Sequence, residues 1–328
     1  MILVFSILWL LLIFLGCLSL GSYVAWWYPI ELISHFRTQY LCFSLIISAL
    51  FLLLRWQTFV KNKILFLLGF IFSLMLVGLN AVEIIPWYLP NSQQISANSE
   101  NKVRFLSFNI NVQNQQYEDI INVVRENNPD VALFMEIEQD SVNKLKPGLN
   151  EFLPYSFKSP GGGLALFSRL PIQDARGDTL NFNSYNLLAT IEINQKPVQL
   201  IATHPVIPVK MDTFHRRNRH LDVIADFVKQ ETLPLILLGD FNLTPWSPYY
   251  RRFTKKTGLH NASLGYGIMA TYPRYTNYVR YPKYIIPLIN IPIDHCFVSQ
   301  EFKVANYRVG NNANSDHAPI IADLVLSE

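Results

Sequence analysis

Acidic, amide and histidine side chains stand at the ends of apolar segments in the last two thirds of the chain. The segments include VRFLSF, VALFM, QLIAT, LILLG and APIIADL. The polar residues beside these and one further apolar run are Asn109, Glu136, His204, Asp240, Asn242, Asp294, Asp316 and His317. Each alone fits a structural role, such as a helix cap or an Asx turn. Together they predict one functional site, because strand ends and loops are where a sheet scaffold displays function.

The residue types favour one chemistry. Carboxylate and amide oxygens suit a hard cation such as Mg²⁺. Histidines and a further aspartate suit proton transfer and stabilisation of a charged transition state. The sequence has no GxSxG nucleophile motif, and its three cysteines form no CxxC or Cys/His zinc pattern. The glycine triplet at 161–163 lacks the Lys-Ser/Thr of a phosphate loop. Metal-assisted attack of water on a phosphate ester is therefore the predicted chemistry.

Hydrophobic periodicity places these residues on a mixed α/β scaffold. The predicted helices are 117–127 and 212–229, and residues 194–195 are predicted to join two strands as a hairpin. The predicted strands are 103–110, 131–135, 164–168, 187–193, 198–203, 235–238, 293–298 and 320–326. Hairpins alternate with strand–helix units, which favours mixed sheets packed together and covered by helices over a Rossmann fold.

The first third of the chain differs from the rest in composition. Of the 328 residues 50% are hydrophobic and 16% are charged, against about 25% charged in an ordinary soluble domain. The deficit lies in residues 1–94, which hold four basic and two acidic residues. The remainder is nearly neutral, which excludes a disordered chain and disfavours a strongly basic nucleic-acid binder. We expect a membrane region at 1–90, a polar linker at 91–101 and a catalytic domain at 102–328.

Three apolar runs, 1–27, 40–54 and 64–82, predict about three transmembrane helices. A buried hairpin and a cleaved signal peptide are the alternatives, but the first run lacks a basic n-region and is too long for a signal. The loop after the second run holds Arg55, Lys61 and Lys63, so it is expected on the cytoplasmic side. Three spans then place the catalytic domain outside the cytoplasm. The orientation reverses if 40–54 does not span.

Seven motifs occur in order along the chain: LSFNINVQN (106–114), DVALFMEIE (130–138), GGGLALFSRLPI (161–172), LIATHP (200–205), LLGDFNLTP (237–245), PIDHCFVS (292–299) and SDHAPIIADL (315–324). This series resembles the endonuclease/exonuclease/phosphatase superfamily, which includes DNase I-like nucleases, sphingomyelinases and inositol-polyphosphate phosphatases. Bacterial membrane-anchored members look most similar. The resemblance implies a four-layer α/β sandwich of two mixed β-sheets flanked by helices, here preceded by N-terminal transmembrane helices.

The resemblance also implies a role for each residue. Glu136 is the principal ligand of Mg²⁺, with Mn²⁺ as the alternative metal, and Asn109 and Asp316 lie beside it. Asp240 orients or deprotonates the attacking water, and Asn242 holds that water or the phosphate. His317, held by Asp294, contacts the scissile phosphate, and His204 assists the leaving oxygen. His295 is expected to be structural.

The motifs leave the substrate open. A lipid head group, a nucleic acid and a small phosphodiester are all candidates, and no protein partner is indicated. The basic stretch 215–220 (HRRNRH) is expected to be the solvated start of a helix, and 251–256 is a second basic patch. The Tyr-rich segment 266–284 suits either a membrane interface or stacking on bases. A nuclease and a catalytically silent, phospholigand-binding membrane scaffold are the alternatives to a phosphoesterase. A transporter is disfavoured, because the spans hold only one polar residue of note, Asn80.

Overall fold

The computed structural model describes residues 2–56, 63–278 and 282–327. The chain forms two compact units. One comprises Met1–Pro86 with Pro245–Pro248, and the other comprises Trp87–Thr244 with Tyr249–Glu328. Residues 57–62, which include Lys61, and residues 279–281 of the Tyr-rich segment lie outside the described residues.

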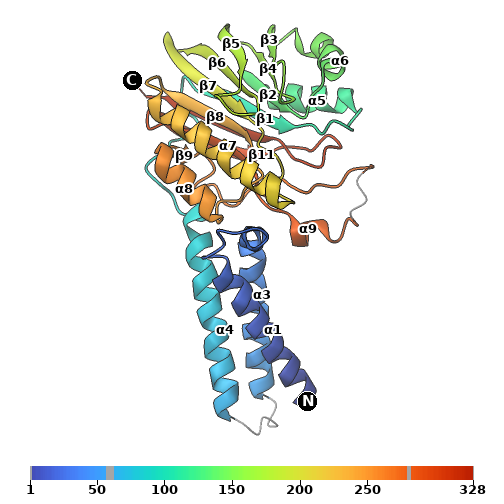
Figure 1. Cartoon of the computed structure of the whole chain (residues 1–328), viewed down its shortest axis with the longest axis vertical. Helices are drawn as coiled ribbons and strands as arrows, with labels where there is room; N and C mark the ends of the chain where they lie inside the picture. Colours follow the sequence, from blue (N-terminus) through green and yellow to red (C-terminus); the bar gives the residue numbers. More distant parts are fainter. Residues whose placement is uncertain (1, 57–62, 279–281, 328) are drawn as a thin grey trace. The chain divides into compact units, whose positions relative to one another are not determined.

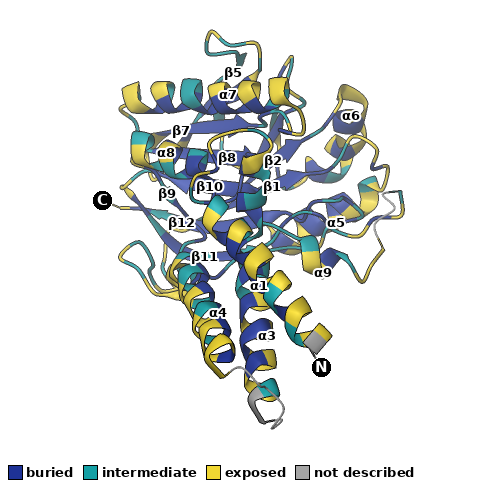
Figure 2. Cartoon of the chain, turned by 60° about the horizontal axis from the view of Figure 1, so that its bottom comes forward, coloured by how far each residue is buried: buried dark blue, intermediate teal, exposed yellow. Residues whose placement is uncertain are grey.

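The first unit is built on three long apolar helices, α1 (Ile2–Gly21), α3 (Arg37–Trp56) and α4 (Lys63–Ile84). The short helices α2 (Ile30–Ile33), η1 (Ser34–Phe36) and η2 (Ile85–Tyr88) complete its helical segments. By length and composition, each of these three helices is long and apolar enough to cross a membrane. Their inner faces pack around Leu12, Phe51 and Leu76, while many outward-facing Leu, Ile and Val side chains are exposed, as Figure 2 shows for α1 and α4. Apolar side chains thus lie on the outer faces of the helices as well as between them, and a lipid environment permits this exposure.

Several buried polar groups of this unit bond to one another. Asn80 is fully buried, and its amide donates to Ser19 Oγ at 3.1 Å, while its carbonyl oxygen accepts from Arg37 Nη1 at 3.1 Å. The tetrapeptide 245–248 belongs to the same unit. Trp246 Nε1 donates to Glu83 O at 3.3 Å, and Ser247 Oγ donates to Glu31 Oε1 at 2.6 Å. Because an unpaired polar group in an apolar interior is costly, these bonds fix the packing of the helices.

The second unit contains two six-stranded mixed sheets. The first has the order β11-β12-β1-β2-β4-β3, and the second has the order β5-β6-β7-β8-β10-β9. The strands of the first are β1 (Val103–Asn109), β2 (Val131–Met135), β3 (Tyr155–Lys158), β4 (Ala165–Ser168), β11 (Phe302–Val309) and β12 (Ile320–Leu326). Those of the second are β5 (Ile172–Asp178), β6 (Asn186–Ile193), β7 (Lys196–Thr203), β8 (Leu235–Asp240), β9 (His260–Asn261) and β10 (Asp294–Val298).

Three apolar clusters hold this unit in four layers. The largest lies between the sheets and includes Phe105, Leu200 and Phe302. A second lies between the first sheet and helices α5 (Tyr117–Asn127) and α6 (Gln139–Leu149). A third lies between the second sheet and helices α7 (Met211–Gln230) and α8 (Pro248–Thr257), and Figure 1 shows these helices over their sheets. The α/β sandwich expected from the sequence is therefore confirmed.

Most predicted elements occur where periodicity placed them. The hairpin between β6 and β7 turns at Asn194 and Gln195, both with positive φ, as a two-residue hairpin turn requires. Periodicity did not predict β5, β11, α6 or α8. The segment of β5, IQDARGD, is mostly polar and carries a bulge, and α6 contains Pro147.

Residues 91–95, part of the expected linker, belong to the second unit and bond to later segments of it. Asn91 Nδ2 donates to Leu264 O at 2.7 Å, and Ile95 N donates to Val304 O at 3.0 Å. In return Val304 N donates to Gln93 O at 2.8 Å. These bonds tie the start of the second unit to the edge of its first sheet.

Candidate catalytic site

Strand register brings the candidate residues to one edge of the sandwich. β1 and β2 are parallel with Asn109 opposite Met135, so Glu136 follows at the next position. β7 and β8 are parallel with Thr203 opposite Gly239, so His204 and Asp240 leave their strands side by side. β10 runs antiparallel to β8 with Asp294 directly opposite Asp240. The same edge of both sheets therefore displays the polar residues.

Asn109 links the two sheets at this edge. Its Nδ2 donates to Glu136 Oε1 at 3.0 Å and to Asp240 Oδ2 at 3.2 Å. Its own backbone carbonyl accepts from Ser315 Oγ at 2.7 Å. Because the side chain is fully buried, this single carboxamide holds two carboxylates from different sheets in a defined arrangement.

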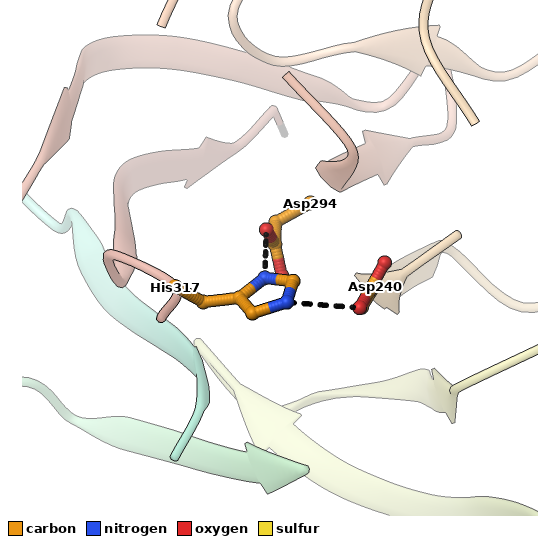
Figure 3. Close-up of side chains that lie close together, drawn as sticks. All are labelled: Asp240, Asp294 and His317. Carbon is orange, nitrogen blue, oxygen red and sulfur yellow. Dashed lines mark hydrogen bonds and ion pairs between the residues drawn. The ribbon is translucent and has the colours of Figure 1, made fainter. Parts of the chain in front are cut away.

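His317 and Asp294 form a buried pair. His317 Nδ1 lies 2.9 Å from Asp294 Oδ2, and Nε2 lies 3.6 Å from Asp240 Oδ2, as Figure 3 shows. Burial alone would lower the pKa of His317, but the charges of Asp294 and Asp240 outweigh burial and raise that pKa to about 10. The imidazole is therefore a cation at neutral pH, with its orientation fixed by Asp294.

Asp240 occupies the centre of the cluster and is 1% exposed. Burial raises its pKa to about 6, although His317 and His204 act in the opposite direction. Its Oδ1 accepts from the backbone N–H of Asn242 at 2.8 Å. The pKa of Asp240 thus lies close to neutral pH, and a group with such a pKa can both accept and release a proton there.

His204 faces the same cluster from the end of β7. Its Nε2 lies 3.6 Å from Asp240 Oδ2 and 3.7 Å from Glu136 Oε1. Both separations exceed a direct hydrogen bond. His204 is more exposed than His317, so it can meet a ligand that enters from solvent.

Asn242 and Asp316 lie at the border of the cluster. The Asn242 side chain turns toward the Pro205 carbonyl, to which Nδ2 donates at 3.0 Å. Asp316 Oδ1 accepts from Asn111 Nδ2 at 2.8 Å. Burial raises the pKa of the Tyr278 hydroxyl, and the charges of Asp316 and Glu136 raise it further, so both carboxylates lie near that ring. Six of the eight predicted residues thus face one another, and these two flank them.

The donor set fits a divalent cation. Asp240, Asp294 and His317 offer ligand atoms within 4.8 Å of one another and could hold a metal ion. Asp294 Oδ1 is buried and has no hydrogen-bond partner among the residues that the structure describes. Glu136 is the more accessible carboxylate, with 30% of its side chain exposed. Carboxylate and amide oxygens of this kind are the ligands that hard cations prefer.

Several supporting residues were not found from the sequence. Ser315 accepts from His317 N at 3.1 Å, the Tyr272 ring lies 4.7 Å from the His317 ring, and Asn111 holds Asp316. Periodicity gave no signal for these loop residues. Arg217 is the most informative, because it is fully buried and its Nη1 donates to Asn242 O at 2.6 Å.

The expectation that 215–220 is a solvated helix start is confirmed only in part. The segment lies inside α7, where His215, Arg216 and Arg219 are exposed but Arg217, Asn218 and His220 are buried. The reason is helical spacing, since positions 217, 218 and 221 share the face that packs on the second sheet. His295 behaves as expected of a structural residue. Its Nε2 lies 2.7 Å from Leu243 O and its Nδ1 lies 3.0 Å from Asn261 Nδ2.

Comparisons with known proteins agree with the fold of the second unit. The model of the Endonuclease/Exonuclease/phosphatase family matches residues 106–317, well over half of the chain. No curated protein matches. Solved structures similar to the chain include an endonuclease/exonuclease/phosphatase from Bacteroides vulgatus, with 20% identity and a TM-score of 0.54 over 69% of this chain and 99% of that one.

Two further solved structures share the fold. Humanized TDP2 of D. rerio has 14% identity and a TM-score of 0.55, over 69% of this chain and 99% of that one. Sphingomyelinase C from Streptomyces griseocarneus has 15% identity and a TM-score of 0.51, over 68% of this chain and 99% of that one. At such identities the likeness concerns the fold alone.

Proposed function

Because the chain belongs to the endonuclease/exonuclease/phosphatase family, we propose that it is a membrane-anchored, divalent-metal-dependent phosphoesterase that hydrolyses a phosphodiester or phosphomonoester by attack of water. The observation that carries the proposal is the hydrogen-bonded cluster in which Asn109 joins Glu136 to Asp240, and Asp240 faces the His317–Asp294 pair. Water attack needs a proton acceptor and a cation at the phosphate, and this cluster contains candidates for both.

His317 is assigned to the scissile phosphate. It is cationic at neutral pH, and Nε2 is the ring nitrogen that Asp294 leaves free to meet the substrate. A buried cation aimed at a phosphoryl oxygen stabilises the charge that grows there in the transition state. Asp294 keeps the ring in position without touching the substrate.

Asp240 is assigned to the attacking water. Its raised pKa makes it a better proton acceptor than an ordinary aspartate, and the Asn242 N–H fixes its orientation. Asn242 holds the water or a phosphate oxygen from the border of the site. His204, which approaches the same carboxylate from the solvent side, assists the leaving oxygen.

Glu136 is assigned as the principal metal ligand, with Asn109 and Asp316 beside it, and the metal as Mg²⁺ or Mn²⁺. The raised pKa of His317 disfavours a cation at the buried trio, because a protonated imidazole has no free nitrogen to bind a metal. A divalent cation at Glu136 would supply positive charge to the phosphate ester.

The deciding experiment uses the full chain in lipid nanodiscs, with Mg²⁺, Mn²⁺ or EDTA. The substrates are single-stranded DNA, sphingomyelin, a phosphoinositide and bis(p-nitrophenyl) phosphate. We expect metal-dependent hydrolysis that falls by about 10²–10⁴-fold in Asp240→Asn and in His317→Ala, the range for loss of an acid–base or charge-stabilising group. Exposed Asp140→Asn and His215→Ala are the matched controls.

Each other outcome has a defined meaning. Cleavage of DNA alone would assign the protein as a nuclease. Normal turnover by a folded Asp240→Asn protein would mean that Asp240 does not act on the attacking water. Binding of a phosphorylated ligand without any hydrolysis would favour the silent scaffold.

The catalytic unit is proposed to face away from the cytoplasm. Three helices are long enough to span, and the basic residues Arg55, Lys61 and Lys63 follow the second. Of two reporters fused after Glu328, one that works only outside the cytoplasm should be active and one that works only in the cytoplasm should be inactive. A cytoplasmic reporter signal would mean that the chain crosses the membrane an even number of times or enters it in the opposite direction.

A further inference from the structure

Large apolar side chains are exposed around the candidate site. They lie in three connections at the site edge: 110–116 after β1, 204–210 after β7, and the described parts of 270–293 before β10. The most exposed of them are Val112, Ile207, Val209, Tyr275, Tyr284 and Leu288, and together with Met211 at the start of α7 they are here called the apolar rim. Leu288 lies on α9 (Ile286–Ile289), whose exposed residues are visible in Figure 2.

The rim is concentrated, not scattered. Val112 is 52% exposed, Met211 60%, Leu288 60% and Tyr284 78%. Outside the rim and its connections, the large apolar side chains of the second unit that are exposed among its described residues are Tyr88 at 59%, Leu89 at 54%, Tyr155 at 44% at the start of β3, and Tyr185 at 39%. Tyr155 pairs with Ser168, which pairs with Val131 at the start of β2, so it lies at the edge opposite the site. Exposed apolar groups gathered on one edge mark an interaction surface.

The charged residues in the three connections indicate the partner of the apolar rim. The three connections carry Lys210, Arg274 and Lys283 among their described residues and no aspartate or glutamate. Lys283 Nζ lies 4.0 Å from the centre of the Tyr275 ring, so a basic group and an aromatic ring stand together. Exposed tyrosines, aliphatic side chains and lysines, in connections that themselves carry no described acidic residue, suit an anionic lipid surface, where apolar groups enter the head-group region and cations meet phosphates.

We propose that the apolar rim docks on an anionic lipid bilayer, so that the catalytic site receives a phosphate ester carried on a lipid head group. The lipid-linked substrate rests on the proposed function, while the docking surface stands on its own residues. The bilayer is the partner to which this unit is tethered, because the same chain carries three helices long and apolar enough to cross a membrane.

Docking can be measured without any activity. Cys17→Ser and Cys42→Ser remove the two exposed thiols, and Cys296 is buried. In that background Leu288→Cys and Tyr155→Cys each carry an environment-sensitive fluorophore, and the full chain is placed in nanodiscs containing doxyl-labelled phosphatidylcholine, with or without phosphatidylglycerol. We expect quenching of the label at 288, greater with phosphatidylglycerol, and little at 155. Lys283→Glu should remove the increase due to phosphatidylglycerol.

Several results would overturn docking. Equal quenching at both positions, or none at 288, would do so. A response of the 288 label to single-stranded DNA in place of lipid would assign the rim to nucleic acid. A response that depends on protein concentration would assign it to a second copy of the chain.

Activity separates this inference from the proposed function. Leu288→Ser should lower hydrolysis of a bilayer-embedded phospholipid about tenfold relative to hydrolysis of bis(p-nitrophenyl) phosphate. The reason is that the variant loses one aliphatic side chain that docking would bury in the bilayer. An unchanged ratio would contradict the lipid substrate. Absence of hydrolysis of either compound would contradict the proposed function, and the quenching result would still decide docking.

Discussion

At the scale of single residues, the site depends on side chains that hold other side chains. Asn109 bonds to two carboxylates, and Asp294 orients His317. Arg217 belongs to the same group and reaches the site through the Asn242 carbonyl. A residue of this kind alters the geometry of catalysis without meeting the substrate, and this can be tested by substitution.

Arg217→Lys should lower kcat by about tenfold or more with little change in KM. A lysine cannot reproduce the planar fork of the guanidinium, and loss of a charge-assisted hydrogen bond costs about 1.5–3 kcal/mol. Steady-state kinetics on the full chain measure the effect, with exposed Arg216→Lys as the control. Equal kcat values for both variants would mean that the bond to Asn242 does not position the site.

At the scale of elements, the site depends on how closely β7 and β8 approach. A Cβ placed on Gly239 would lie 1.9 Å from the Thr203 carbonyl oxygen, so the last position before Asp240 has no room for a side chain. The glycine therefore allows His204 and Asp240 to leave adjacent strands at the distance seen.

Gly239→Ala should destabilise the second unit by about 3 kcal/mol or more, since the strand must move to relieve the overlap. Activity should fall with stability. The matched control is Gly78→Ala in α4, where a Cβ would meet no atom within 4 Å. Thermal unfolding of both variants in the same detergent measures the difference, and an unchanged midpoint for Gly239→Ala would contradict the close approach.

Sequence periodicity predicted the elements that position the site and could not predict the contacts between them. Alternation and apolar runs located β1, β2, β7 and β8 because each has a buried side, and the polar residue at each strand end marked the site. The order of strands within each sheet depends on long-range pairing, which local spacing does not encode. The burial of Arg217 was not predicted for the same reason, because only the packing of α7 determines it.

At the scale of the whole molecule, buried neutral histidines couple stability to pH. Burial lowers the pKa of His295 to about 4, and it lowers the pKa of His220 likewise to about 4. In the unfolded chain a histidine takes up its proton near pH 6.5, before the folded protein does. The stabilisation due to each neutral ring is therefore complete above pH 6.5 and is lost as pH falls from 6.5 through 4.

His295→Gln should flatten this dependence. The wild-type loss due to His295 amounts to at most about 3 kcal/mol, from 1.4 kcal/mol for each unit of pKa. Asp240, whose raised pKa acts in the opposite direction below pH 6, is present in both proteins and cancels from the comparison. Unfolding midpoints of the full chain at pH 7.5 and pH 4.5 measure the change. The exposed His215→Gln variant should keep the wild-type dependence of stability on pH. If His295→Gln also kept it, the lowered pKa of His295 would not be a source of that dependence.

The tetrapeptide 245–248 limits how this gene can be divided. It directly follows Thr244 of the second unit, yet Trp246 and Ser247 are buried among the helices of the first unit. A recombination event that exchanged only the N-terminal helices would leave Trp246 packed against helices of a different sequence. Inheritance should therefore keep the helices and residues 245–248 together, and chimeras should tolerate a foreign anchor only when 245–248 is replaced with it.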